Sequence, residues 1–190
     1  MDKSIDTTLE KIRRGQYKPS DFIIADAKDE DMGGGIFCTG AQLEDASRTR
    51  SYPEYLQVMR KMFSSGLVDL KLMSASSAER LVEEGLFENS PVPPAVRYND
   101  ATDIWGPRHS VYQKHPSRNF RTLHLNKLTS LVYLGLYSVI FSNDIEKDTE
   151  SLEGLRSFLS ELSITGMRYF LEVFNPQVDI GISQQCRIRV

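Results

Sequence analysis

The chain has 190 residues and a formal net charge of −3, and 40% of its residues are hydrophobic and 26% charged. This length suits one domain, residues 1–190, and the small net charge gives no general attraction to nucleic acid or to anionic membranes. No apolar run is long enough to cross a bilayer, and no signal-peptide core is present. We therefore expect a cytoplasmic protein that binds neither nucleic acid nor membranes.

The chain opens with a predicted amphipathic helix. Ile5, Leu9 and Ile12 recur at helical spacing, and Ser4 or Asp6 is the expected N-cap. A short helix ahead of the first strand is expected to plug or pack against the fold that follows.

The first predicted strand runs from about Phe22 to Ala27 and is followed by charged residues. A short run rich in Ile and Phe is typical of a buried strand, where an unpaired charge is costly, so charges are expected at its end. Asp26, Lys28 and Asp29 lie there, and alternation places Asp26 and Lys28 on one face. Parallel α/β enzymes place their chemistry at this end of a strand, so we predict Asp26 and Lys28 as catalytic residues.

The second predicted strand, Leu67–Met73, carries an amine in its middle. This amine belongs to Lys71, which we predict as a further catalytic residue. Ser74 follows the strand and is predicted to bind substrate. Ser76 and Glu79 form a capping-box pattern, which predicts the start of the next helix.

The third predicted strand, Ala95–Asn99, carries Arg97, which we predict to bind substrate. Residues 100–127 show no clear pattern and hold all three histidines and many cations. One interpretation is a basic lid for an anionic substrate such as a sugar phosphate, and the other is a solvated loop. The histidine spacing matches no common zinc signature, and Cys38 and Cys186 show no CxxC spacing, so we expect no metal and no cofactor.

The fourth predicted strand, Leu136–Phe141, is followed by Ser142, Asn143 and Asp144. We predict Asp144 to bind substrate, because it lies at the carboxyl end of the strand. The next helix is expected to begin at a cap provided by Asp148 or Thr149.

The fifth predicted strand, Arg168–Phe174, contains Glu172 between large apolar residues. Glu172 is therefore predicted to be a buried functional acid or to face a polar barrel interior. Asn175 ends the strand and is predicted to bind substrate.

Five strands that alternate with helices predict a parallel α/β sheet with right-handed crossovers. Two architectures fit: an open, five-stranded doubly wound sheet, or an incomplete (β/α)8 TIM barrel of about five βα units. Central strands of doubly wound sheets are apolar on both faces. Four of the predicted strands instead carry charge on one face: Asp26 and Lys28, Asp69 and Lys71, Arg97, and Glu172. A polar barrel interior accepts such charges and lets them pair across the barrel, so we favour the incomplete barrel.

Three segments also carry a resemblance to a known family: Phe22–Asp29, Val68–Ser76 and Glu172–Pro176. They resemble the first, second and fifth strands of a bacterial group of aldolase-type TIM barrels. That group is similar to the class I aldolases, which include deoxyribose-phosphate and tagatose-bisphosphate aldolases. The resemblance extends to about Asp179, and its motifs are more specific to the fold than to the reaction.

The resemblance implies a carbon–carbon lyase that acts on a small carbonyl or sugar-phosphate substrate through a lysine Schiff base. In such aldolases the reactive lysine usually lies on the sixth strand and the phosphate site on the seventh and eighth, and this chain ends before them. Lys28 and Lys71 are then the candidate amines, with Asp26 and Glu172 as acids that transfer protons. The alternative is a structural ion-pair network of these four residues inside the barrel.

Other hypotheses stay open at this point. A complete doubly wound domain would bind a phosphate or a nucleotide without covalent chemistry. A barrel of five units exposes two sheet edges and an apolar interior, which predicts a homo-oligomer. On the barrel interpretation, an inactive truncated form is a further hypothesis.

Overall fold

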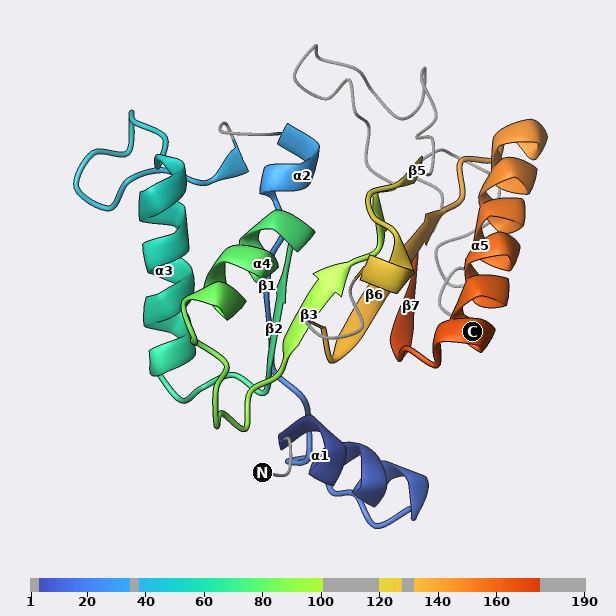
Figure 1. Ribbon diagram of the computed structural model, residues 1–190, viewed down its shortest axis with the longest axis horizontal. Helices are drawn as coiled ribbons and strands as arrows, with labels where there is room; N and C mark the ends of the chain where they lie inside the picture. Colours follow the sequence, from blue (N-terminus) through green and yellow to red (C-terminus); the bar gives the residue numbers. More distant parts are fainter. Residues whose placement is uncertain (1–3, 35–37, 101–119, 128–131, 175–190) are drawn as a thin grey trace.

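The computed structural model describes residues 4–34, 38–100, 120–127 and 132–174 (Figure 1). Its elements in chain order are α1 (Ser4–Arg13), β1 (Ala25–Lys28), α2 (Asp31–Gly34), α3 (Tyr52–Ser64), β2 (Leu70–Met73), α4 (Ala75–Glu83), β3 (Pro94–Arg97), β4 (Asn99–Asp100), β5 (Phe120–Arg121), the 3-10 helix η3 (Leu125–Lys127), β6 (Leu134–Ile140), α5 (Ile145–Thr165) and β7 (Tyr169–Phe174). None of the helices in these ranges combines the length and the apolar character needed to cross a membrane.

The main sheet contains five parallel strands in the order β1-β2-β3-β6-β7. Among the described strands the spatial order never reverses, whereas a doubly wound sheet reverses at its switch point. Right-handed crossovers then place every connecting helix on one face, and Figure 1 shows α3, α4 and α5 outside a curled half-barrel. The parallel α/β sheet is therefore confirmed and the doubly wound alternative is wrong. The described residues do not form a complete (β/α)8 barrel.

The first two strands begin later than expected. β1 starts at Ala25 and β2 at Leu70, three residues after the predicted starts. Phe22 and Leu67, where strands were expected to begin, are 63% and 65% exposed. Just before the strands, the Asp69 side chain accepts a 2.9 Å hydrogen bond from the Ile24 amide, and the Asp69 amide donates to the Ile24 carbonyl at 2.8 Å. Ala25 and Leu70 are the first register partners of β1 and β2, so the two strands begin at the same level.

Two helix caps also differ from expectation. Ser74, rather than Ser76, caps α4, and its Oγ accepts from an amide in the first turn. Asp144, rather than Asp148 or Thr149, caps α5 and accepts from two amides. Several hydroxyl and carboxyl side chains precede each helix, and the cap is the one whose own backbone is extended while the next residue is helical.

The sheet has one apolar core on each face. On the concave face, β2, β3 and β6 pack against α1, which lies at the amino ends of the strands. On the outer face, the same strands pack against α3, α4 and α5. Since side chains alternate, core membership fixes the face that each polar side chain takes. The concave core is Ile5, Leu70, Leu72, Ala95, Leu134 and Leu136, and the outer core includes Met73, Val96, Tyr98, Tyr137, Val139 and Phe158.

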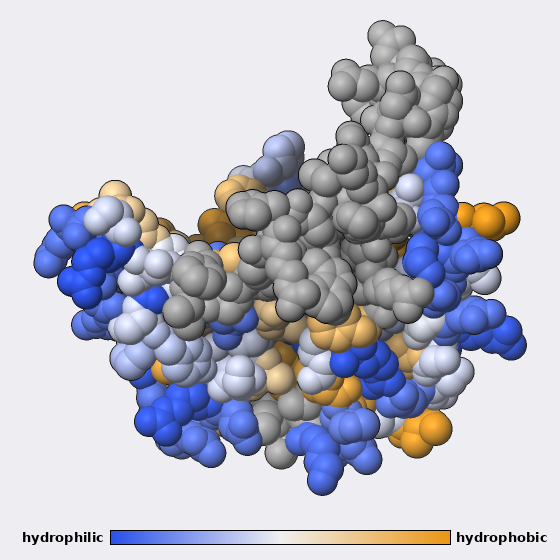
Figure 2. Space-filling model, turned by 90° about the horizontal axis from the view of Figure 1, so that it is seen from above, coloured by the Kyte–Doolittle hydropathy of each residue, from blue (hydrophilic) through white to orange (hydrophobic). Residues whose placement is uncertain are grey.

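Figure 2 looks onto the carboxyl ends of the strands from above, and the described outline of the molecule is mostly hydrophilic. Amphipathic helices that bury one stripe produce such an outline. Exposed apolar residues include Leu43, at 87%, and Ile145 and Ile164 of α5, at 84% and 85%.

Candidate functional site

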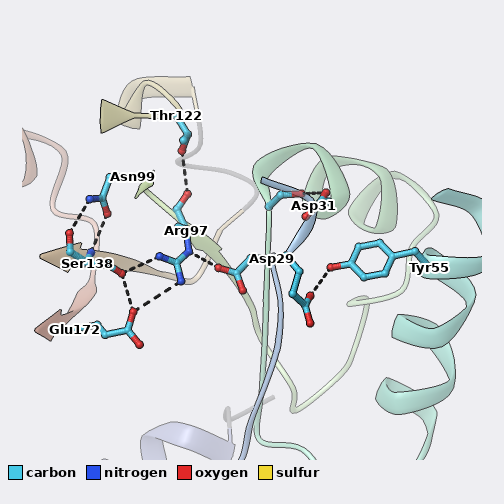
Figure 3. Close-up of polar contacts among 10 residues, drawn as sticks. Asp29, Asp31, Tyr55, Arg97, Asn99, Thr122, Ser138 and Glu172 are labelled. Carbon is cyan, nitrogen blue, oxygen red and sulfur yellow. Dashed lines mark hydrogen bonds and ion pairs between the residues drawn. The ribbon is translucent and has the colours of Figure 1, made fainter. Parts of the chain in front are cut away.

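A network of four polar side chains lies on the concave face at the carboxyl ends of the strands (Figure 3). Arg97, at the end of β3, donates from Nε to Asp29 and from Nη1 to Ser138 Oγ, the latter at 2.9 Å. Ser138 donates to Glu172 Oε2 at 2.7 Å, and Arg97 Nη2 lies 3.8 Å from the same oxygen. The network joins the end of β1 to β3, β6 and β7.

Strand register explains why these side chains meet. Ser138 and Glu172 are paired positions of β6 and β7, so both point to the same face. Arg97 alternates with Ala95, and Ser138 with Leu136, and both apolar residues belong to the concave core. Apolar side chains thus fill the layer nearer α1, and polar ones fill the layer at the carboxyl ends. Parallel α/β enzymes hold their ligands at this end of the sheet.

Asn99 supports Ser138 from the neighbouring strand. β3 ends at Arg97, and the chain turns away into β4. The Asn99 carboxamide continues the ladder to β6, because Nδ2 donates to the Ser138 carbonyl and Oδ1 accepts from the Ser138 amide, each at 2.8 Å. Asn99 is fully buried, so the serine in the centre of the network has a fixed support.

The network is partly buried and carries excess negative charge. The side chains of Arg97 and Asp29 are 14% and 11% exposed, whereas that of Glu172 is 36% exposed. One guanidinium faces two carboxylates, which gives a net charge of 1 − 2 = −1. Glu172 is the charged member most open to solvent and therefore the one best placed to meet a ligand.

Three consecutive acids after β1 fasten the end of this strand to three other elements. Asp29 pairs with β3, Glu30 accepts a 2.7 Å hydrogen bond from Tyr55 of α3, and Asp31 accepts one of 2.7 Å from Ser74 (Figure 3). Burial, with the hydrogen bond to Glu30, raises the pKa of Tyr55, and burial also raises the pKa of Asp31. These contacts hold Asp29 in place beside Arg97.

Asp26 and Lys71 form an ion pair, but on the outer face of the sheet. They are register partners of β1 and β2, and Lys71 alternates with Leu70 and Leu72, which lie in the concave core. Lys71 is fully buried, and burial lowers its pKa although the bond to Asp26 opposes this. The predicted position inside the barrel is therefore wrong for this pair, because the apolar neighbours of Lys71 occupy the concave face. The pair joins adjacent strands rather than opposite sides of a barrel.

The remaining predicted site residues lie elsewhere. The Lys28 Nζ atom is 3.3 Å from a carboxylate oxygen of Glu30. Ser74 and Asp144 cap helices, as described above. Asn175 lies outside the described residues.

The structure brings the predicted charged residues together in two separate groups. Arg97 and Glu172 meet in the network, and Asp26 and Lys71 meet on the outer face. No contact between the two groups is found among the described residues.

Two members of the site escape prediction from the sequence. Ser138 is a polar residue within the apolar strand β6, which is the signal that could reveal it. Asn99 carries no such signal, because it is the last residue of the third predicted strand and asparagine is common where a strand leads into a turn. Asp29 is expected at the end of β1, and its partner Arg97 becomes visible only in the fold.

Part of the predicted basic segment is described. Arg121 pairs with Glu161 of α5, while residues 101–119 lie outside the described residues. Within the described ranges, no group of three or more His, Cys, Asp or Glu side chains is placed to hold a metal ion.

Comparison with known proteins assigns no family: no protein-family model matches the chain, and a search of curated proteins finds no match. The aldolase resemblance therefore stays a resemblance, and the function is argued from the site.

Proposed function

We propose that the protein is an aldolase-like carbon–carbon lyase that acts on a small hydroxycarbonyl compound at the Arg97 network. The main support is the position of Glu172, a partly exposed carboxylate held by Ser138 and Arg97 at the end of the sheet where barrel enzymes place their chemistry. The half-barrel architecture and the three aldolase-like segments add support by analogy of fold.

Glu172 is the proposed general base. With a β-hydroxy carbonyl substrate, it accepts the proton of the β-hydroxyl group. The carbon–carbon bond then breaks, the hydroxyl-bearing carbon becomes a carbonyl, and the electron pair leaves on the other fragment as an enolate. Return of the proton to the α-carbon of that fragment regenerates the carboxylate. Arg97 and Ser138 contribute positive charge and hydrogen-bond donors beside the reacting groups.

Proton exchange tests this proposal before the full reaction is known. The protein is incubated in D2O with a panel of hydroxyaldehydes and hydroxyketones, and 1H NMR follows exchange at the carbon next to the carbonyl. We expect exchange or cleavage with the wild type and a loss of about 100-fold in Glu172→Gln. Glu84→Gln is the matched control, because Glu84 also pairs with an arginine, Arg60, but lies outside the network. No exchange by the wild type, or equal rates in Glu172→Gln, contradicts the proposal.

A Schiff base on Lys71 is a second candidate mechanism, and one observation favours it. Burial lowers the pKa of Lys71, and imine formation needs an amine with a lowered pKa. Its side chain has no exposed surface and pairs with Asp26, so a substrate reaches it only after the outer face opens. Borohydride trapping followed by mass spectrometry decides the matter. An adduct that is lost in Lys71→Met supports the imine, and unmodified Lys28 and Lys71 across the panel contradict it.

A further inference from the structure

Among the described residues of the network, Arg97 carries the positive charge to which an anionic ligand would bind. Neighbouring protein groups already counter this charge. Nε faces Asp29, Nη1 lies 2.9 Å from Ser138 Oγ, and Nη2 lies 3.8 Å from Glu172. Arginine recognises phosphate by pairing two N–H groups of one edge with two phosphate oxygens. In this network protein oxygens already accept hydrogen bonds from Nε and Nη1, and a carboxylate lies within ion-pair distance of Nη2.

The surrounding charge also disfavours an anion. The network carries a net charge of −1, and Glu30 and Asp31 follow directly after Asp29 in the sequence. Lys28, the cation nearest in sequence, pairs with Glu30. Like charges repel more strongly in a partly buried site than in water, so a phosphate group meets repulsion here.

Carboxylates in this position suit hydroxyl groups instead. Both contacts of Glu172 to described residues use Oε2, which leaves Oε1 to accept a hydrogen bond from a ligand hydroxyl. The side chain is 36% exposed, so a small molecule can reach this oxygen. A compound with several hydroxyl groups supplies the donors that two carboxylates require.

We infer that the site takes an uncharged polyhydroxy or hydroxycarbonyl compound and discriminates against its phosphorylated form, because Asp29 and Glu172 already neutralise Arg97. This inference rests on the proposed function, since it names the substrate class of the same site. It decides between the carbonyl and sugar-phosphate substrates that the sequence leaves open.

Asp29→Asn tests the inference, because it removes one countercharge of Arg97 and keeps an oxygen that accepts from Nε. We expect this variant to bind inorganic phosphate about tenfold more tightly than the wild type, as measured by isothermal titration calorimetry and 31P NMR. Glu172→Gln, at a more exposed position, is the second variant in case Asp29→Asn impairs folding. Glu84→Gln is the control and is expected to leave phosphate binding unchanged.

Wild-type affinities complete the test. Dihydroxyacetone and D-ribose are expected to bind more tightly than dihydroxyacetone phosphate and ribose 5-phosphate. Tighter binding of the phosphates by the wild type, or no gain of phosphate binding in either variant, overturns the inference. The proposed function is tested by a different result: it fails when the wild type exchanges no proton on any carbonyl compound. The phosphate measurements on the variants do not depend on that result.

Discussion

The ring of Tyr98 covers Gly135 so closely that a Cβ atom at position 135 would lie 1.9 Å from the ring carbon Cζ. Tyr98 follows β3, and Gly135 lies in the adjacent strand β6. The Tyr98 hydroxyl also donates to the Arg168 carbonyl, just before β7, at 3.1 Å. One ring therefore ties three strands of the half-barrel together, and only glycine leaves room for it.

We expect Gly135→Ala to lower the free energy of unfolding by about 3 kcal/mol, because an added methyl group forces the ring or the backbone to move. Urea unfolding followed by circular dichroism measures this change. Gly154→Ala within α5 is the control: its Cβ would lie 3.3 Å from the Tyr137 hydroxyl, and alanine favours helix, so a change below about 1 kcal/mol is expected. Equal stability of Gly135→Ala and the wild type would contradict the packing described here.

Asn99→Asp keeps the shape of the side chain but replaces the donor to the Ser138 carbonyl with a carboxylate oxygen. Because Asn99 is fully buried, we expect a loss of about 3 kcal/mol in unfolding free energy and faster hydrogen exchange of the Ser138 amide. Thr122→Val is the control, since Thr122 is exposed and bonds only weakly, at 3.3 Å, to the Arg97 carbonyl. Unchanged exchange at Ser138 would show that the network does not depend on this carboxamide.

The sequence predicts the parallel sheet more readily than it predicts which face of the sheet each side chain takes. Alternation of strands and helices is a local pattern, and so is the stop of α5 at Gly166, which has φ of 66°. β2 differs, because all four of its residues are buried and its burial pattern does not alternate. Hydrophobicity therefore does not show which face Lys71 takes. Only packing against α1 on one side and the outer helices on the other decides it.

The candidate site depends on contacts between distant positions. Arg97 and Ser138 are 41 residues apart in the chain, and Ser138 and Glu172 are 34 apart. Each residue by itself is a plausible site residue or a plausible surface charge, and a single sequence does not specify which ones meet. Arg97 and Glu172 were predictable as functional candidates because charge is unusual within an apolar stretch, whereas their connection through Ser138 requires the register of β6 and β7.

The free energy of unfolding is expected to depend on pH through Asp31. Burial raises its pKa above the usual 3.8, although hydrogen bonds from Ser74 and Ser77 oppose this. The folded state then binds a proton more readily than the unfolded chain, so the contribution of Asp31 to stability is complete below pH 3.8 and is lost as pH rises through the folded-state pKa. We expect Asp31→Asn to raise the free energy of unfolding at neutral pH, and this gain to vanish at about pH 3.5. A gain of equal size at both pH values in urea unfolding would refute the assignment.

The stability that Asp6 contributes is expected to change with pH in the opposite direction. Arg168 donates to Asp6 at 2.9 Å and to the Tyr133 hydroxyl at 2.6 Å, and this contact fastens α1 to the sheet. Burial alone would raise the pKa of Asp6, but the hydrogen bonds from Tyr133 and Arg168 outweigh it and lower the pKa from 3.8. The stabilisation is therefore present above pH 3.8 and is lost as pH falls through the lower folded-state pKa.

Hydrogen exchange of the α1 amides measures this effect. We expect Asp6→Asn to speed their exchange at neutral pH by a factor that corresponds to about 1 kcal/mol, since the pair is partly exposed. Asp45→Asn, in a loop away from α1, is the control and leaves these amides unchanged. Slow exchange of α1 in Asp6→Asn would mean that the apolar contacts of Ile5 and Leu9 and the hydrogen bonds of Ser4 hold the helix without Asp6.

Self-association is expected through β7. Among the described residues this strand pairs with β6 on one edge only, and five of its six residues are exposed. Leu171 and Val173, on the outer face, are 44% and 54% exposed, and an apolar edge strand is a template for pairing with a second copy.

Sedimentation velocity at several concentrations should show association of the wild type and a shift towards monomer in Val173→Glu. Ile164→Glu, at the end of α5, is the matched control because Ile164 is exposed but lies outside the sheet. Val173 points away from the concave network. A wild type that stays monomeric at every concentration would therefore rule out this edge as an interface without bearing on the role proposed for Glu172.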